Sequence, residues 1–176
     1  MVALSAPSTR ATSWRLPFPC EFGAVRPATT LALEFLRDHG VGDATLMALE
    51  LAIVEACNNA VRYSEGTARQ LPAALEVVCG EREIVVRIED HTPGFELQSD
   101  IALPEADQET GRGLFLIQSL TDGVEYLRGR HSNTLVLRKE RVPGEVSVPA
   151  GPALEWRQQV LESEQIIRDM AEELSF

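Results

Sequence analysis

An acidic side chain and two amides interrupt an otherwise apolar stretch in the first half of the sequence. Residues 51–63 read LAIVEACNNAVRY, with a carboxylate at Glu55 and carboxamides at Asn58 and Asn59. In a helix, residues three and four apart share a face, so these side chains would lie together. The carboxylate can accept a proton, and an amide oxygen one turn away can ligate a hard cation such as Mg²⁺. A helix with one solvated polar face would show the same pattern, so this segment alone leaves both interpretations open.

Two later segments carry residues that fit the same kind of site. Residues 84–95, IVVRIEDHTPGF, are a β-branched run that ends in Asp90 and a Pro-Gly turn. Residues 109–120, ETGRGLFLIQSL, place Gly111 and Gly113 directly before an apolar helical run. Glycines at a helix entry let a ligand approach the backbone, and the free amides and helix dipole there favour phosphate. The ordered combination of all three segments is much more specific than any one of them.

In this order the segments resemble the motifs of the GHKL (Bergerat-fold) ATPase superfamily, which includes type II topoisomerases, heat-shock chaperones and sensor histidine kinases. Over residues 14–141 the chain is most similar to the stand-alone bacterial anti-sigma factor serine/threonine protein kinases. The N box is matched by Glu55, Asn59 and Ala60, the first glycine box by Asp90, Gly94 and Phe95, and the second by Gly111, Gly113, Leu114, Leu116 and Ile117. Residues 122–139 match the last two strands of that group.

The resemblance implies an ATP/ADP and Mg²⁺ site with a role for each matched residue. Asn59 would ligate Mg²⁺, and Glu55 would take a proton from a Ser or Thr of the partner, or from water. Asp90 would accept a hydrogen bond from the adenine amino group, and Gly94 would let the backbone pass beneath the base. The other nucleotide-binding positions it implies are Gly111, Arg112, Gly113, Leu114 and Thr134. A solvated arginine and an ordinary strand threonine are equally good interpretations of Arg112 and Thr134.

Two places depart from the family pattern. Thr92 stands where the first glycine of the first box is usual, so the turn must hold a Cβ, and its hydroxyl could keep a water beside the base. Tyr63 and Ser64 replace the His-Gly pair that often follows the N box. Neither departure removes a residue to which the chemistry is assigned. They bear on the level of activity and not on nucleotide binding.

Composition limits the class of protein. At 176 residues with 44% apolar residues, the chain suits one domain with an added element. A net charge of −11 argues against nucleic acid or an anionic membrane as the main partner. The apolar runs are short and the N-terminus has no signal pattern, so we expect no membrane span. The widely spaced Cys20, Cys57 and Cys79 suggest reduced buried thiols and a cytoplasmic location.

Periodicity predicts an α/β two-layer sandwich, with helices on one face of a mixed, mostly antiparallel sheet. Strands are expected at residues 14–20, 75–79, 84–89, 124–127 and 134–138, and helices at 24–39, from Asp43 through the N box, and at 112–120. Gly40 is expected to stop the first helix, and Asp43 can cap the second. The apolar stripe of the second helix is expected to face the core: Leu46, Leu49, Ile53, Ala56 and Ala60. Pro17 and Pro19 place the first strand at a sheet edge. The second and third strands are expected to form an antiparallel hairpin. Residues 99–110 are expected to be a loop, which the resemblance makes the lid over the phosphates.

The domain organisation follows from shifts in composition. We expect a flexible tail at residues 1–13, the ATP-binding domain at 14–141, a Pro/Gly-rich linker at 142–152 and an amphipathic helix at 153–176. The last helix lies outside the resemblance. Packing against its own domain, dimerisation and partner capture all remain open for it.

The leading hypothesis is an ATP-dependent serine/threonine protein kinase that acts as an anti-sigma-type switch. The resemblance implies that it phosphorylates an anti-anti-sigma partner (a STAS-domain protein), sequesters a sigma factor or another regulator, and works as a homodimer. The alternative is a nucleotide-binding regulatory module with little or no kinase activity, which Thr92, Tyr63 and the C-terminal helix favour. A sensor histidine kinase is disfavoured because we expect no helical hairpin with a phosphoacceptor His before the N box. A metal-dependent hydrolase is disfavoured because no second carboxylate or His cluster accompanies Glu55.

Overall fold

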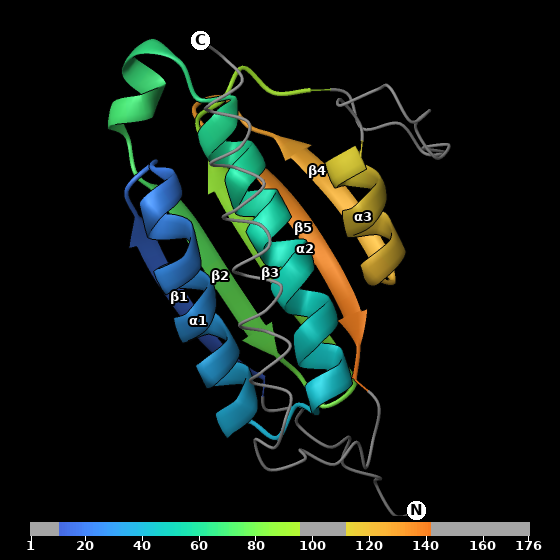
Figure 1. The fold of residues 1–176 in the computed structure, drawn as a ribbon. Coiled ribbons are helices and arrows are strands. Elements are labelled where there is room, and N and C mark those ends of the chain that lie inside the picture. The colour runs from blue at the N-terminus through green and yellow to red at the C-terminus, as the bar shows by residue number, and fades with distance from the viewer. Residues whose placement is uncertain (1–10, 96–111, 142–176) are drawn as a thin grey trace, which may run out of the picture. The chain divides into compact units, whose positions relative to one another are not determined.

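The computed structural model describes residues 11–95 and 112–141, all within one compact unit of the chain, Met1–Val146. Five strands form a single sheet in the order β1-β2-β3-β5-β4, and three helices cover one of its faces (Figure 1). The predicted α/β two-layer sandwich is therefore confirmed. All strand pairings among the described residues are antiparallel, where the sequence prediction allowed a mixed sheet.

Each of the predicted strands is present, with slightly different ends. The strands are β1 (Thr12–Phe18), β2 (Ala73–Cys79), β3 (Glu83–Asp90), β4 (Gly123–Arg128) and β5 (Asn133–Glu140). Strand β1 pairs only with β2 and lies at the sheet edge, as the prolines require, since proline has no N–H for a second neighbour. The predicted hairpin of β2 and β3 is confirmed, with Val77 opposite Val86.

The predicted helices are also present. They are α1 (Phe22–Asp38), α2 (Asp43–Arg62) and α3 (Arg112–Leu120). Helix α1 ends at Asp38 with His39 as its cap, directly before the predicted stop at Gly40. Gly40 adopts a φ of 72°, and the Val41 amide donates to the carbonyl of Leu36. Asp43 does not cap α2 as expected: Gly42 holds the cap position, and Asp43 lies in the first turn, where its charge favours the helix dipole. A short 3₁₀ helix, η1 (Gly66–Gln70), was not predicted.

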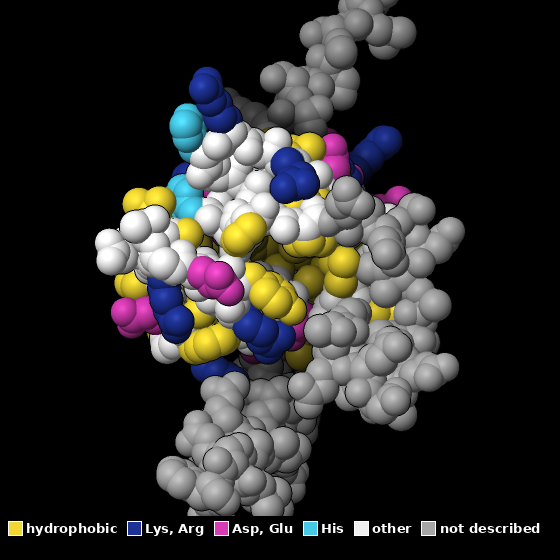
Figure 2. All heavy atoms as spheres, turned by 90° about the horizontal axis from the view of Figure 1, so that it is seen from above, with side chains coloured by type: hydrophobic (Ala, Val, Ile, Leu, Met, Phe, Trp, Pro, Cys, Tyr) yellow, Lys and Arg dark blue, Asp and Glu magenta, His cyan; other side chains and the backbone are white. Residues whose placement is uncertain are grey.

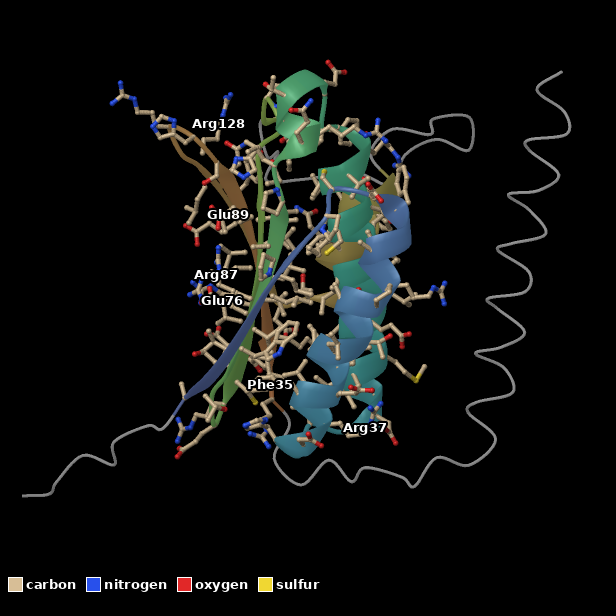
Figure 3. All side chains as sticks on the ribbon, turned by 90° about the vertical axis from the view of Figure 1, so that its left-hand side faces the viewer. Phe35, Arg37, Glu76, Arg87, Glu89 and Arg128 are labelled. Atoms are coloured by element: carbon tan, nitrogen blue, oxygen red, sulfur yellow. The ribbon has the colours of Figure 1, made fainter. Side chains whose placement is uncertain are left out.

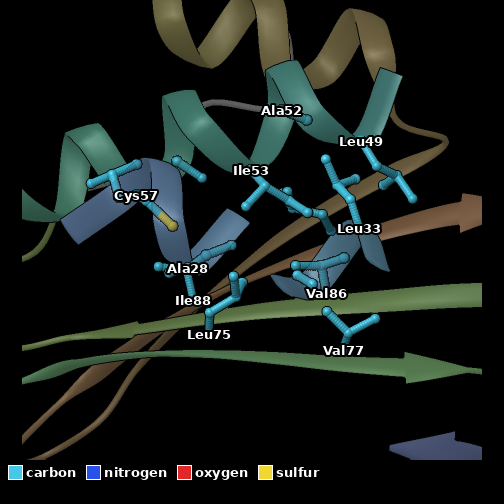
Figure 4. Packing of buried hydrophobic residues seen from close by; sticks show 14 of the residues in the cluster. Ala28, Leu33, Leu49, Ala52, Ile53, Cys57, Leu75, Val77, Val86 and Ile88 are labelled. Atoms are coloured by element: carbon cyan, nitrogen blue, oxygen red, sulfur yellow. The ribbon is translucent and has the colours of Figure 1, made fainter. Parts of the chain in front are cut away.

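The hydrophobic core lies between the sheet and the helices, and α2 is its central element. The predicted stripe on α2 is buried throughout: Leu46, Leu49, Ile53, Ala56 and Ala60. It packs against Leu75 and Val77 of β2 and Val86 and Ile88 of β3 (Figure 4). Burial of each such aliphatic side chain contributes about 1.5–3 kcal/mol. By length and composition alone α2 could cross a membrane, but half of that stretch is buried in this core.

The three cysteines are free and buried, as predicted. Cys57 lies on the buried side of α2, and burial raises the pKa of its thiol to about 12. Since a thiol must lose its proton to react or to bind a metal, this cysteine is inert in the folded protein.

The sheet face opposite the helices, here called the outer face, carries paired charges. Glu76 and Arg87 point away from the helices (Figure 3) and form an ion pair of 3.0 Å. Arg15 of β1 pairs with Glu89 of β3 at 2.5 Å across the strands. On β3, the outward-pointing Arg87 and Glu89 alternate with the buried Val86 and Ile88. The alternation places the core on one face of the sheet and the solvated charges on the other.

Candidate active site

A cavity of about 610 Å³ opens at the end of the two layers where α2 and β3 both finish. Viewed from this end, the surface is hollowed and hydrophobic side chains line the floor (Figure 2). The apolar part of the wall includes Ile88 from β3, Ile117 from α3 and Leu135 from β5. The cavity is therefore assembled from segments that are far apart in the sequence.

The structure brings together residues from all three sequence motifs. Six residues to which a site role is assigned line the cavity: Glu55, Asn59, Asp90, Gly94, Gly113 and Leu114. Asn58 is not among the lining residues. Gly111 and the predicted lid at 99–110 lie outside the described residues, as does the side chain of Arg112, whose backbone begins α3.

Glu55 and Asn59 reach the cavity because they lie in the last two turns of α2. Their neighbours one position along, Ala56 and Ala60, are buried, so the helix turns its apolar stripe to the sheet and this polar edge to the cavity. Asp90 arrives by a different rule. It continues the inward alternation of β3 after Ile88 and is itself only 7% exposed.

Gly113 allows the carboxylate of Glu55 to lie directly against α3. A Cβ built on Gly113 would be 2.0 Å from Oε1 of Glu55 and 2.7 Å from its Cδ. No side chain fits there unless one of the two helices or the carboxylate moves. The glycine of the second box thus sets the position of the N-box glutamate, a role that the sequence analysis did not anticipate.

The amide oxygen of Asn59 is available for a cation, with one weak competitor. Nη1 of Arg62, one turn along α2, donates to Oδ1 of Asn59 at 3.4 Å, a long contact. Among residues 11–95 and 112–141, no group of three or more His, Cys, Asp or Glu could hold a metal. A cation at Asn59 would therefore need phosphate and water oxygens to complete its coordination, as Mg²⁺ commonly has in nucleotide sites.

Asp90 is held by a hydrogen-bond network at the base of the cavity. Its Oδ1 accepts from the backbone amide of Thr92 at 2.8 Å and from the Thr92 hydroxyl at 2.6 Å. Nδ2 of Asn133 donates to the same oxygen at 3.4 Å and to the carbonyl of Thr92 at 2.8 Å. Thr92, which replaces a family glycine, is thus fitted to the carboxylate and not merely tolerated beside it.

Asn133 was missed by the sequence analysis, which assigned the neighbouring Thr134 to the nucleotide. The strand register places Asn133 opposite Asp90 and Thr134 opposite Glu89. Successive side chains of a strand point to opposite faces, so Thr134 lies on the outer face with Glu89. Accordingly, Thr134 does not line the cavity.

Two aromatic residues form the wall beside Asp90. The rings of Phe95 and Tyr126 stack with centroids 4.1 Å apart. Burial raises the pKa of Tyr126, and the nearby charge of Asp90 adds to the effect, while Thr92 and the backbone of Phe95 partly offset it. Oη of Tyr126 lies near Thr92 and the backbone of Phe95, but it is buried and no described residue forms a hydrogen bond of acceptable geometry with it. This residue was also absent from the sequence prediction.

Gly94 is required by conformation and by space. Its φ of 83° lies in the left-handed region, and a Cβ there would be 3.2 Å from Nε of Arg128 and 3.3 Å from Oη of Tyr126. The cavity therefore combines apolar walls, a buried carboxylate and an orphaned hydroxyl at one end with a carboxylate and an amide on α2. The first part fits a flat base that carries an amine, and the second part fits a phosphate chain with its cation.

Comparison with known proteins assigns the family. Residues 18–139 match the family model of the histidine kinase-like ATPase domain, and the chain belongs to that family. No match is found among curated protein sequences.

Two solved structures share the fold, which is of the Bergerat ATPase type. One contains the RsbU and RsbW domains of Rv1364c from Mycobacterium tuberculosis, with 14% identity and a TM-score of 0.58 over 78% of this chain and 35% of that chain. The other is the SiaB–SiaC complex from Pseudomonas aeruginosa, with 13% identity and a TM-score of 0.50 over 72% of this chain and 89% of that chain. This chain thus corresponds to about a third of the longer mycobacterial chain.

Proposed function

We propose that the protein is an ATP-dependent serine/threonine protein kinase that acts as an anti-sigma-type regulatory switch. Its substrate is an anti-anti-sigma partner, a STAS-domain protein, and it alternately sequesters a sigma factor or another regulator. It works in the cytoplasm as a homodimer. A partner-dependent role is supported by the structural neighbours, of which SiaB was solved in complex with SiaC.

One observation carries the proposal: Glu55, Asn59 and Asp90 line a single cavity in a histidine kinase-like ATPase domain. Asp90 has the buried carboxylate that an adenine amino group needs as acceptor. Glu55 and Asn59 lie one helical turn apart on α2, where a phosphate chain bound along the cavity could reach both. Base recognition and phosphate chemistry are thus assigned to different elements of the same cavity.

In the proposed reaction, the hydroxyl oxygen of a partner Ser or Thr attacks the terminal phosphorus of ATP, the bond to the bridging oxygen breaks, and ADP leaves. When bound, ATP would supply the phosphoryl group and Mg²⁺ would neutralise charge on the phosphates. Glu55 accepts the hydroxyl proton, and Asn59 holds the cation through its amide oxygen. The backbone amides of Arg112, Gly113 and Leu114 at the start of α3 would bind phosphate, as would that of Gly111, which lies outside the described residues.

The test is phosphotransfer by the wild type and by Glu55→Gln, with Mg²⁺–ATP and STAS-domain proteins encoded near this gene. We expect a stoichiometric phosphoprotein with the wild type. General-base catalysis contributes about 10²–10⁴-fold, so the variant should transfer phosphate slower by that factor while ADP binding stays within about 3-fold. Glu34→Gln, on the exposed side of α1, is the matched control and should behave as the wild type. A wild type that binds ATP but modifies no partner would refute the kinase half of the proposal.

A second candidate is a nucleotide-regulated binding module that holds its partner without phosphotransfer. The contact of Arg62 with Asn59 favours it, because a guanidinium beside the amide oxygen competes with a cation. Glu55→Ala separates the two candidates. Lost regulation with intact ATP binding supports the kinase, and unchanged regulation supports the binding module.

A further inference from the structure

The polar residues around Asp90 form a network that the motif match does not explain. Asp90 ends β3, Thr92 lies in the turn that follows, Asn133 begins β5 and Tyr126 lies in β4. Asp90 and Asn133 are both buried, and water competes weakly for hydrogen bonds between buried groups. The distribution of these bonds over the two carboxylate oxygens decides what Asp90 can offer a ligand.

One oxygen of the Asp90 carboxylate is fully engaged. The amide and the hydroxyl of Thr92 and the side-chain amide of Asn133 all donate to Oδ1. The hydroxyl contact of 2.6 Å has the length typical of an O–H donor to an ionised oxygen. Since a carboxylate oxygen offers about two lone pairs, Oδ1 has no capacity left. No described residue donates to Oδ2, which remains for a ligand.

The hydrogen bonds also fix the orientation of the carboxylate. The amide of Gly94 donates to Oγ1 of Thr92 at 3.3 Å, so the single hydroxyl proton of Thr92 is directed to Asp90. Asn133 joins the carboxylate to the Thr92 carbonyl and prevents the turn from moving away. Rotation of the carboxylate would break the three bonds that Oδ1 accepts, so Oδ2 keeps one direction.

Tyr126 supplies an unused hydrogen-bond donor near Asp90. Its Oη is buried without a partner in the described residues, and Asp90 is close enough for its charge to act on the phenol. A raised pKa keeps the phenol protonated at neutral pH, so it can donate. A buried hydroxyl without a partner lowers the stability of the folded protein, and a ligand atom that accepts a hydrogen bond from it removes that penalty.

We propose that Tyr126 is a second base-reading residue of the site, and that Thr92 and Asn133 are positioning residues that aim Oδ2 of Asp90 at the base. The inference rests on the proposed adenine-nucleotide function and names which residues select the base. Oδ2 accepts from the exocyclic amine while Oη donates to a neighbouring ring nitrogen. Adenine presents this donor and acceptor side by side, whereas guanine and hypoxanthine place a carbonyl oxygen where the amine would be, facing the carboxylate.

The role of Tyr126 is tested with Tyr126→Phe, by calorimetric titration with ADP and by thermal unfolding of the free protein. ADP binding should weaken about 5- to 10-fold, because a buried hydrogen bond is lost. The melting midpoint of the free protein should stay the same or rise, because the deleted hydroxyl had no partner. A midpoint that falls while ADP binding is unchanged would assign Tyr126 a structural role and overturn this part of the inference.

The positioning role is tested by comparing Thr92→Val with Thr92→Ser. Serine keeps the hydroxyl and should bind ADP within about 2-fold of the wild type, whereas valine keeps the shape and should bind about 10-fold more weakly. The ratio of the affinities for ADP and inosine diphosphate should also fall by about 10-fold in the valine variant, and it should not change in the serine variant. Equal behaviour of the two variants would show that the hydroxyl does not aim Asp90.

Titration of the wild type with ADP and with inosine diphosphate separates this inference from the proposed function. If the wild type binds neither ligand, both fail. If it binds ADP, prefers it to inosine diphosphate and phosphorylates a partner, but Tyr126→Phe and Thr92→Val bind like the wild type, the inference alone fails. Weaker binding by both variants with the preference reduced supports it.

Discussion

Glu89 and Asp90 are neighbours on β3, yet their carboxylates lie in different environments. The Glu89 side chain is 30% exposed on the outer face and pairs with Arg15 at 2.5 Å. Asp90 is 7% exposed and accepts hydrogen bonds from Thr92 and Asn133 on the cavity side. Because successive side chains of a strand point to opposite faces, Glu89 points to the solvent and Asp90 points to the interior.

The two environments give the two carboxylates different roles. The hydrogen bond from Arg15 is the main cause of the lowered pKa of Glu89, with smaller contributions from Ser132 and from the charge of His91. An exposed pair of this kind contributes only about 0–1 kcal/mol, because water screens both charges. Asp90 is buried at the cavity, and the hydrogen bonds to its Oδ1 leave the other oxygen for a ligand. The outer carboxylate thus adds a little stability, and the inner one is suited to recognition.

The sharpest test of this contrast exchanges each carboxylate for its amide. Asp90→Asn should weaken ADP binding by about 100-fold or more, because the new NH₂ faces the adenine amine or leaves it without an acceptor. Glu89→Gln, one residue away, should change ADP binding by less than about 2-fold, since surface pairs carry little energy. Calorimetric titration measures both, and thermal unfolding checks that each variant is folded. Similar losses in the two variants would contradict the assignment of the faces.

A second test applies the same contrast to glycines. Gly113→Ala places a methyl group against the Glu55 carboxylate and should lower the free energy of unfolding by about 1–3 kcal/mol. Gly23→Ala in α1 is the control, because a Cβ there meets nothing within 4 Å. Its stability should be unchanged or higher by up to about 1 kcal/mol. Urea unfolding measures both variants.

A double variant tests whether the loss of stability in Gly113→Ala comes from the clash with Glu55. Glu55→Ala removes the carboxylate that the new methyl group would meet, so adding Gly113→Ala to it should cost much less than in the wild type. Residues in contact show such coupling, whereas independent residues give additive losses. Additive losses here would mean that Gly113 is required for a reason other than Glu55.

The smallest effect concerns the outer face and depends on pH. A lowered pKa in the folded state means that ionised Glu89 stabilises the fold above its unfolded pKa of about 4.3, and that this contribution is lost as pH falls through the folded value. Glu89→Gln should therefore cost about 0.5 kcal/mol at pH 7 and nothing near pH 2. Urea unfolding at the two pH values measures the difference. A cost that persists at low pH would point to packing and not to charge.

Most of the fold could be predicted from the sequence because its signals are local. The apolar periodicity of α2 and the β-branched runs of β2 and β3 identify the elements, and Pro17 identifies the edge strand. These local signals do not identify an element that lacks periodicity, and they do not decide which of two neighbouring residues caps a helix. Residues 66–70, which form η1, have no periodicity, and the cap of α2 falls on Gly42 although Asp43 is the better capping residue type.

The site was predictable to the extent that its residues sit in ordered motifs, as Glu55, Asn59 and Asp90 do. Its remaining residues depend on pairing between distant segments. Asn133 reaches Asp90 only through the register of β3 with β5, and a shift of one residue separates it from the predicted Thr134. Tyr126 enters through the pairing of β4 with β5, which places it opposite Leu135. No spacing along the chain contains this information.

Strand β5 begins beside Asp90 and ends at Glu140, where the chain leaves the sheet. At about 3.3 Å per residue, this strand separates its two ends by roughly 25 Å. Arg141 then fastens the exit by donating to the carbonyls of His39 and Gly80. A tether, dye or surface linkage joined to the exposed Glu140 would start on the far side from the ligand entrance, which makes this end of the strand a suitable place to immobilise the protein for binding measurements.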